Sequence, residues 1–228
     1  MYSDNNFNII KMRKSDKIAD SEGDPPRMHL VASIASRPLA YLTKEEVERF
    51  FAVIPHDRTR DRLLFDLIYR HGLRRREAGI IGREHAAGGR IWITRVKGGV
   101  SGEYRLHPTT TRLLWSYLNE RSGDENPYLI VGRQRGSSAI SPSLIYQLFR
   151  KYAELAQIPS DRCHPHVLRH SIAVHLMNAG WDAADVQDWL GHRDIASTMV
   201  YAAVTNKRRE AKYEEALLSR EIAGNEAS

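Results

Sequence analysis

Apolar residues recur with a helical period through most of the chain after residue 42. Thr43-Lys44-Glu45-Glu46 has the Ser/Thr-x-x-Glu form of a capping box, which predicts a helix beginning there. In residues 59–69, four aliphatic side chains fall on one stripe and predict a second helix that ends before Gly72. Further helices are expected at about 74–80, 108–121, 143–156, from Pro165 through a buried row of Leu168, Ile172 and Leu176, and at 182–190, 195–202 and 207–222.

The period changes between residues 90 and 106. Residues 90–96 alternate and are rich in β-formers, residues 97–102 read as a glycine-rich turn, and residues 103–106 can return as a second strand. This pattern predicts a small antiparallel hairpin with Lys97 at its tip. The expected fold class is therefore mainly α with a small antiparallel β-hairpin or sheet, an α+β arrangement.

The ends of the chain differ from the middle. Residues 1–40 show no sustained periodicity, include the pair Pro25-Pro26, and carry six basic and five acidic residues. We expect 1–40 to be a disordered tail, 41–222 to be one folded domain, and 223–228 to be a frayed end.

Composition narrows the class of partner. The 228 residues carry a net charge of +6, nearly all of it outside the tail, and this favours a polyanion such as nucleic acid. The single cysteine, Cys163, excludes an internal disulfide framework and a multi-cysteine zinc site. No apolar run approaches the roughly 20 residues of a membrane span, and no secretion signal is evident at the N-terminus. A cytoplasmic protein without a membrane partner is expected.

The densest polar segment is residues 163–170, Cys-His-Pro-His-Val-Leu-Arg-His. His166 and Arg169 share a face in the first turns of a predicted helix, where free N–H groups and the helix dipole favour an anion. A phosphate site is one interpretation, and a solvated helix face is the other. His166 and His170 also have the spacing of a helical zinc pair, but Val167 stands where that motif needs Glu, so no metal is expected.

The order of other polar residues favours the phosphate site. Gly72-Leu73-Arg74 and Glu77 precede the hairpin lysine, Leu190-Gly191-His192 follows Arg169 by 23 residues, and Tyr201 follows His192 by nine. In this order and spacing the chain resembles the tyrosine recombinase (phage integrase) family from about Leu42 to Arg209. The family's residues fall on Arg74, Glu77, Lys97, His166, Arg169, His192 and Tyr201.

The resemblance implies site-specific DNA breaking and rejoining through a 3′-phosphotyrosyl intermediate, a chemistry like that of type IB topoisomerases. Tyr201 would be the nucleophile, and Arg74 and Arg169 would hold the phosphate oxygens with guanidinium forks. His166 would accept the tyrosine proton, Lys97 would protonate the departing 5′-hydroxyl, and His192 would donate a hydrogen bond to the phosphate. Glu77 would hold the arginines or the histidine in place. No cofactor or metal is expected, because the bond energy is conserved and arginines replace a metal ion.

The resemblance also implies partners. These are double-stranded DNA and a homotetramer on two DNA sites, with possible accessory DNA-bending proteins. Most relatives carry an additional N-terminal helical domain, and the short stretch before the motif is similar to fimbrial phase-variation invertases without that domain. His164 to Ser171 and Gly191-His192-Arg193 also read like that subgroup. Two alternatives stay open: a recombinase-like DNA-binding regulator that does not cut, and a histidine-based metallohydrolase.

Overall fold

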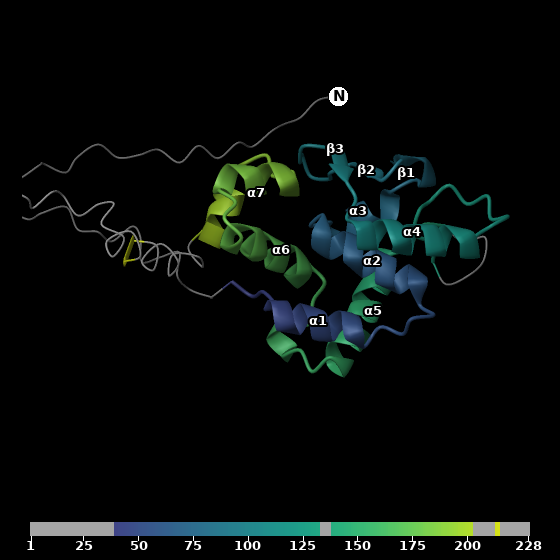
Figure 1. The fold of residues 1–228 in the computed structure, drawn as a ribbon, viewed down its shortest axis with the longest axis horizontal. Helices are drawn as coiled ribbons and strands as arrows, with labels where there is room; N and C mark the ends of the chain where they lie inside the picture. The colour runs from purple at the N-terminus through teal and green to yellow at the C-terminus, as the bar shows by residue number, and fades with distance from the viewer. Residues whose placement is uncertain (1–38, 133–137, 203–212, 215–228) are drawn as a thin grey trace, which may run out of the picture. The chain divides into compact units, whose positions relative to one another are not determined.

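The computed structural model describes residues 39–132, 138–202 and 213–214. Within them, the helices α1 to α7 form most of the fold, and a small three-stranded sheet lies at one edge of them (Figure 1). The elements are α1 (Lys44–Ala52), α2 (Thr59–Arg70), α3 (Arg75–Ile80), β1 (Ala86–Ala87), β2 (Arg90–Ile93), β3 (Gly102–Arg105), α4 (Pro108–Glu120), α5 (Pro142–Leu155), α6 (His166–Asn178) and α7 (Ala183–Leu190). Residues 196–202 are also helical, as predicted for 195–202. The predicted fold class is confirmed.

Local signals place the helix ends close to where the sequence predicts them. Thr43 caps α1 through the predicted capping box: its hydroxyl accepts from the Glu46 N–H, and the Glu46 carboxylate accepts from the Thr43 N–H. Gly191 ends α7 in the left-handed conformation, at φ +62°. Pro165 lies one position earlier than predicted, before the first residue of α6 rather than on it.

The predicted hairpin is present, with one strand more than expected. β2 pairs antiparallel with β3, and the two residues of β1 pair with β2 on its other side. Two alanines carry almost no strand signal, so the sequence does not indicate β1. β2 ends at Ile93, before the predicted Val96, because the next N–H groups bond to side chains: Arg95 N–H to the Ser101 hydroxyl and Val96 N–H to the Glu77 carboxylate.

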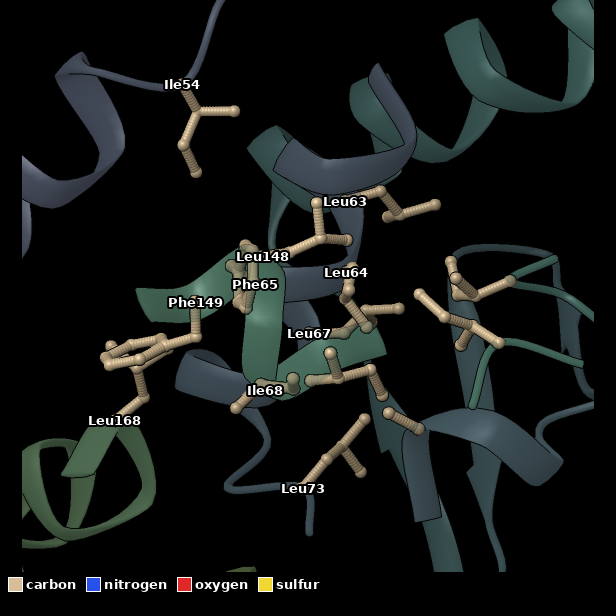
Figure 2. Close-up of a cluster of buried hydrophobic side chains, with 14 of the residues drawn as sticks. Ile54, Leu63, Leu64, Phe65, Leu67, Ile68, Leu73, Leu148, Phe149 and Leu168 are labelled. Atoms are coloured by element: carbon tan, nitrogen blue, oxygen red, sulfur yellow. The ribbon is translucent and has the colours of Figure 1, made fainter. Parts of the chain in front are cut away.

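The main hydrophobic core centres on α2 (Figure 2). Leu63, Leu64, Leu67 and Ile68, the predicted apolar stripe, are all buried, and α2 packs against both α4 and α6. Aromatic rings close the core beside them, with Phe50 stacked on Phe149 at a centroid distance of 4.9 Å. Burial of these side chains anchors the ends of α2 and α6, from which candidate site residues project.

Helix α6 differs from its predicted buried row. Leu168 is fully buried, but Ile172 and Leu176 are only partly buried. Val167 and Val174 are buried instead, because α6 lies between the main core and a second cluster formed with α7. A helix enclosed on two sides has no single apolar face, so periodicity alone does not identify its buried residues.

Two predictions at the chain ends fall largely outside the described residues. These are the tail at 1–40, of which only Leu39 and Ala40 are described, and the helix at 207–222, of which residues 213–214 are described and helical. In the described part of the chain, no helix combines the length and apolar character needed to cross a membrane.

Candidate active site

Three of the predicted site residues line one cavity. Arg74 before α3, Lys97 after β2 and His166 at the start of α6 border a hollow of about 410 Å³. Its other lining residues include Arg75 and Arg76, so the hollow is strongly basic. A larger hollow of about 940 Å³, at the start of α2 and the end of α4, holds none of the predicted residues.

Glu77 is completely buried and joins Arg74 to the hairpin. One carboxylate oxygen accepts from Arg74 Nη1 at 2.6 Å and from the Val96 N–H at 3.2 Å. The other accepts from the Arg74 N–H at 2.9 Å and from Arg95 Nη1 at 3.0 Å. Burial by itself raises the pKa of Glu77, but the hydrogen bonds from Arg74 and the charge of Arg95 outweigh it, and the pKa is lowered. Glu77 is therefore an ionised bridge between two arginines.

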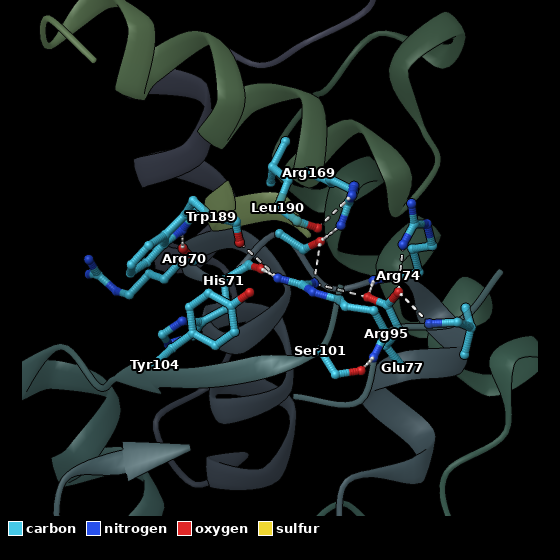
Figure 3. A network of polar contacts seen from close by, with 12 residues as sticks. Arg70, His71, Arg74, Glu77, Arg95, Ser101, Tyr104, Arg169, Trp189 and Leu190 are labelled. Atoms are coloured by element: carbon cyan, nitrogen blue, oxygen red, sulfur yellow. Dashed lines mark hydrogen bonds and ion pairs between the residues drawn. The ribbon is translucent and has the colours of Figure 1, made fainter. Parts of the chain in front are cut away.

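Arg169 lies deeper than the sequence suggests. Its face of α6 was interpreted as a phosphate site or as a solvated helix face, but the residue is only 1% exposed. Its guanidinium donates to the carbonyl oxygens of Gly72 and Leu190, at the C-terminal ends of α2 and α7 (Figure 3). Burial and the charges of Arg74 and Arg95 lower the pKa of Arg169 to about 9, which leaves it charged at neutral pH.

Tyr201 lies in the second hydrophobic cluster and is 2% exposed. Its hydroxyl is 3.0 Å from Nδ1 of His170, a residue to which the sequence interpretation gave no catalytic role. Burial raises the pKa of Tyr201, while the charges of Arg169 and Arg74 act in the opposite direction. Burial together with the nearby His164 and Arg169 lowers the pKa of His170 to about 4, so its ring is neutral at neutral pH.

His192 and His166 flank this tyrosine–histidine pair. The ring of His192 lies parallel to that of Tyr201 with centroids 6.4 Å apart, and its Nδ1 is 2.8 Å from the Thr198 hydroxyl. The ring of His166 meets that of His170 edge-on at 4.5 Å. Burial and nearby positive charges lower the pKa of His192 to about 4. The same two causes lower the pKa of His166 to about 3, although part of that side chain faces solvent.

Lys97 is exposed and sits in a strained turn. Its φ of +57° is a left-handed conformation that non-glycine residues seldom adopt. The turn is tied to the end of α7, because the Val100 N–H donates to the Gly191 carbonyl at 3.2 Å. The predicted hairpin lysine is therefore held at the edge of the cavity by a contact with a segment more than 90 residues away.

That contact makes Gly191 sensitive to substitution. A Cβ at this position would lie 2.5 Å from the Val100 carbonyl oxygen, a backbone atom, whereas a Cβ on Gly123 would meet nothing within 4 Å. Both glycines have positive φ, so both Gly→Ala changes share the conformational cost. We expect Gly191→Ala to lose about 1–3 kcal/mol more unfolding free energy than Gly123→Ala, the usual cost of overpacking. Urea unfolding of the two variants measures the difference; equal losses would contradict the close approach.

Two residues beside the candidate site, the partly buried His170 and the buried Arg95, were missed from the sequence. His170 was considered there only as a metal ligand, and its contact with Tyr201 spans 31 residues. For Arg95, the sequence does contain an indication. The alternation of the inward-pointing Ile91 and Ile93 continues to residue 95, so a charged residue falls at a position that is buried. Among the described residues, no group of three or more His, Cys, Asp or Glu side chains is placed to hold a metal ion.

His71 makes the stability of the fold depend on pH. Its ring is 1% exposed, stacks on Trp189, and neither ring nitrogen has a hydrogen-bond partner among the described residues. Burial, with the charges of Arg95 and Arg70, lowers its pKa to about 3. Below about pH 6.5 His71 is protonated in the unfolded chain but stays neutral in the folded chain. The free energy of unfolding therefore falls as the pH drops.

The variant His71→Phe removes this titration and keeps an aromatic ring. We expect its stability relative to the wild type to rise by up to about 1.4 kcal/mol per pH unit between about pH 6.5 and pH 4. Urea unfolding across that range measures the difference, with His56→Gln at an exposed histidine as the control. A constant difference between His71→Phe and the wild type would show that His71 is protonated in the folded chain.

The fold and this cluster of arginines, histidines and one tyrosine define a class of protein. The chain belongs to the phage integrase family, whose model matches residues 40–208. Over 189 residues it is 35% identical to tyrosine recombinase XerA of Pyrococcus furiosus, covering 81% of this chain and 64% of that relative. The chain thus spans less than two thirds of that relative's length.

Solved structures of recombinases share this fold. A crystal structure of XerA recombinase matches with a TM-score of 0.69 at 24% identity, over 78% of this chain and 65% of the other. The XerH site-specific recombinase bound to difH substrate, in a pre-cleavage complex, matches with a TM-score of 0.63 at 25% identity. That match covers 72% of this chain and 51% of XerH.

Proposed function

We propose that this chain is a site-specific DNA recombinase that cuts and rejoins DNA through a 3′-phosphotyrosyl bond to Tyr201. The observation that carries the proposal is convergence: side chains from five separate segments gather around one basic cavity and one tyrosine. The similar proteins agree with this chemistry: XerA is a tyrosine recombinase, and XerH is a site-specific recombinase whose structure holds its difH substrate. Double-stranded DNA is the proposed partner.

Each predicted residue keeps a proposed role. Arg74, at the cavity, and Arg169, after a movement that uncovers it, stabilise the negative charge that develops on the phosphate. Lys97 protonates the departing 5′-oxygen, His192 donates to the phosphate, and Glu77 orients Arg74. The roles need no cofactor and no metal, since the guanidinium groups supply the positive charge.

The contact with Tyr201 adds His170 to this set. Its Nδ1 lies at hydrogen-bond distance from the tyrosine hydroxyl, and in the neutral tautomer with Nδ1 unprotonated it accepts a hydrogen bond from that hydroxyl. We therefore propose that His170 receives the Tyr201 proton, the role that the sequence interpretation gave to His166. His166 lines the cavity instead and is proposed to contact the phosphate.

Attack by Tyr201 also requires a movement. The residue is 2% exposed, so a phosphate in the cavity does not reach its hydroxyl in this arrangement. We propose that residues 196–202 shift toward the cavity when DNA binds. The exposed Met199 and Val200 show that this segment is packed on one side only.

Further features remain proposals. We propose that four protomers act on two DNA sites in the cytoplasm, with accessory DNA-bending proteins where the site requires them. Kinship with the short fimbrial invertases is also proposed, on the motif at residues 164–171 and the Gly191-His192-Arg193 run. The relatives reported above are recombinases of the Xer type, so this subgroup is a narrower statement than the family.

Capture of the covalent intermediate tests the proposal. The full chain is incubated with a library of randomised, nicked duplexes, in which a strand break next to the scissile phosphate lets the cleaved fragment diffuse away. Adducts that survive denaturing detergent are recovered and sequenced.

An adduct supports a recombinase and yields the sequence of its DNA site. Sequence-specific binding without any adduct would support the non-cleaving regulator instead. Activity that requires a divalent metal and stops in EDTA would support the metallohydrolase.

A further inference from the structure

Arg95 is a buried cation at the junction of the segments that carry the proposed catalytic groups. Its side chain is 0% exposed, and it comes two residues after β2 and two residues before Lys97. Figure 3 shows its guanidinium between the end of α2, the carboxylate of Glu77 and the end of α7. None of the roles proposed above uses it.

The contacts of Arg95 join three segments. Nη2 donates to the His71 carbonyl at 3.0 Å and to the Trp189 carbonyl at 2.9 Å, at the C-terminal ends of α2 and α7. Nη1 donates to Glu77 Oε2 at 3.0 Å and to the Gly72 carbonyl at 3.4 Å. A positive charge at two helix C-termini is favourable, because the last carbonyl groups carry partial negative charge.

The same contacts link Arg95 to both candidate arginines. Glu77 is shared between Arg95 and Arg74, and the Gly72 carbonyl is shared between Arg95 and Arg169. The backbone of Arg95 also begins the Lys97 turn, where its N–H donates to the Ser101 hydroxyl at 3.0 Å. If the Arg95 guanidinium is displaced, we therefore expect the Lys97 turn and the Arg74–Glu77 pair to move as well.

We infer that Arg95 is a positioning residue, which holds the Lys97 turn against the Arg74–Glu77 pair so that the lysine reaches the departing 5′-oxygen. The inference rests on the recombinase function proposed above. In the cleavage step the Tyr201 oxygen bonds to phosphorus, the bond from phosphorus to the 5′-oxygen breaks, and Lys97 gives that oxygen a proton. Arg95 touches none of these atoms. It acts by fixing where the turn begins.

The chain offers a matched control for a purely structural arginine. Arg121 is 6% exposed, pairs with Asp124, donates to three backbone carbonyls and lies 5.5 Å above the ring of Tyr117. Arg95 likewise has one carboxylate, three carbonyls and the ring of Tyr104 at 5.3 Å. Arg121 lies at the end of α4 and lines the larger hollow there, not the cavity that Arg74 and Lys97 line. Arg→Lys at either position keeps the charge and removes the fork.

The test measures single-turnover cleavage of the nicked duplex recovered by adduct capture, at saturating protein. Both Arg95→Lys and Arg121→Lys should melt at lower temperature than the wild type and still fold. We expect Arg95→Lys to cleave about 10- to 100-fold more slowly, the usual cost of a small misplacement, and Arg121→Lys to cleave at the wild-type rate. DNA affinity should change little in either variant.

A second substrate distinguishes positioning of the acid from a general loss of structure. When sulfur replaces the bridging 5′-oxygen, the leaving thiolate is stable without a proton, because thiols are far more acidic than alcohols. On this substrate Arg95→Lys should return to within about threefold of the wild type, as Lys97→Ala should. An equal defect on both substrates, or no defect on the oxygen substrate, would overturn the inference. Failure of the wild type to form any adduct would overturn the proposed function itself.

Discussion

Tyr201→Phe is expected to abolish the covalent protein–DNA adduct. The substitution removes only the hydroxyl, so the ring keeps its place in the cluster with Val174, Val186 and Leu190. Without the nucleophile, adduct formation should fall by at least about 10³-fold, the scale on which loss of a catalytic nucleophile acts. The fold should lose only about 0.5–1.5 kcal/mol, the net value of the hydrogen bond to His170. Denaturing gels of single-turnover reactions measure the adduct, and urea unfolding measures the fold.

Tyr213→Phe is the matched control for this prediction. Tyr213 is the next tyrosine along the chain and is 57% exposed, so it is the obvious rival nucleophile. Its variant should form the adduct at the wild-type rate. If the adduct survives in Tyr201→Phe and disappears in Tyr213→Phe, the assignment of the nucleophile is wrong, while the recombinase chemistry still stands.

Arg74→Ala should have the second largest effect. Arg74 borders the cavity, and its removal leaves Glu77 paired with Arg95 and the Val96 N–H, so the chain should still fold. Loss of one preorganised donor to the developing charge typically costs about 10²- to 10³-fold in rate. We expect a decrease of that size in single-turnover cleavage at saturating DNA.

Arg76→Ala separates this role from simple attraction to DNA. Arg76 has the same charge, lies two residues away and is exposed. Both variants should bind DNA more weakly, and each should reduce the salt dependence of binding by about one phosphate contact. Only Arg74→Ala should cleave slowly once DNA is saturating. Equal cleavage rates would favour the interpretation of residues 74–76 as a solvated basic face.

The sequence predicted the helices better than it predicted the burial of the site residues, and the reason is physical. Helix ends depend on local chemistry, such as the capping box at Thr43 and the left-handed Gly191, and these were predictable. Whether a side chain is buried depends on which segments, distant in the sequence, pack against it. The pattern of its own helix placed Arg169 on a phosphate-binding or solvated face, but the side chain is covered because α7 ends against it.

The sequence by itself determined most of the elements, though not β1, together with their order and the set of side chains able to act on a phosphodiester. Only the tertiary structure decided which of them touch. The pairing of Tyr201 with His170, the sharing of Glu77 by two arginines and the link from Arg95 to α7 join segments 18 to 94 residues apart. Such contacts follow from how the helices pack on α2 and α6, and no local pattern encodes the distance between two segments that meet only in the folded chain.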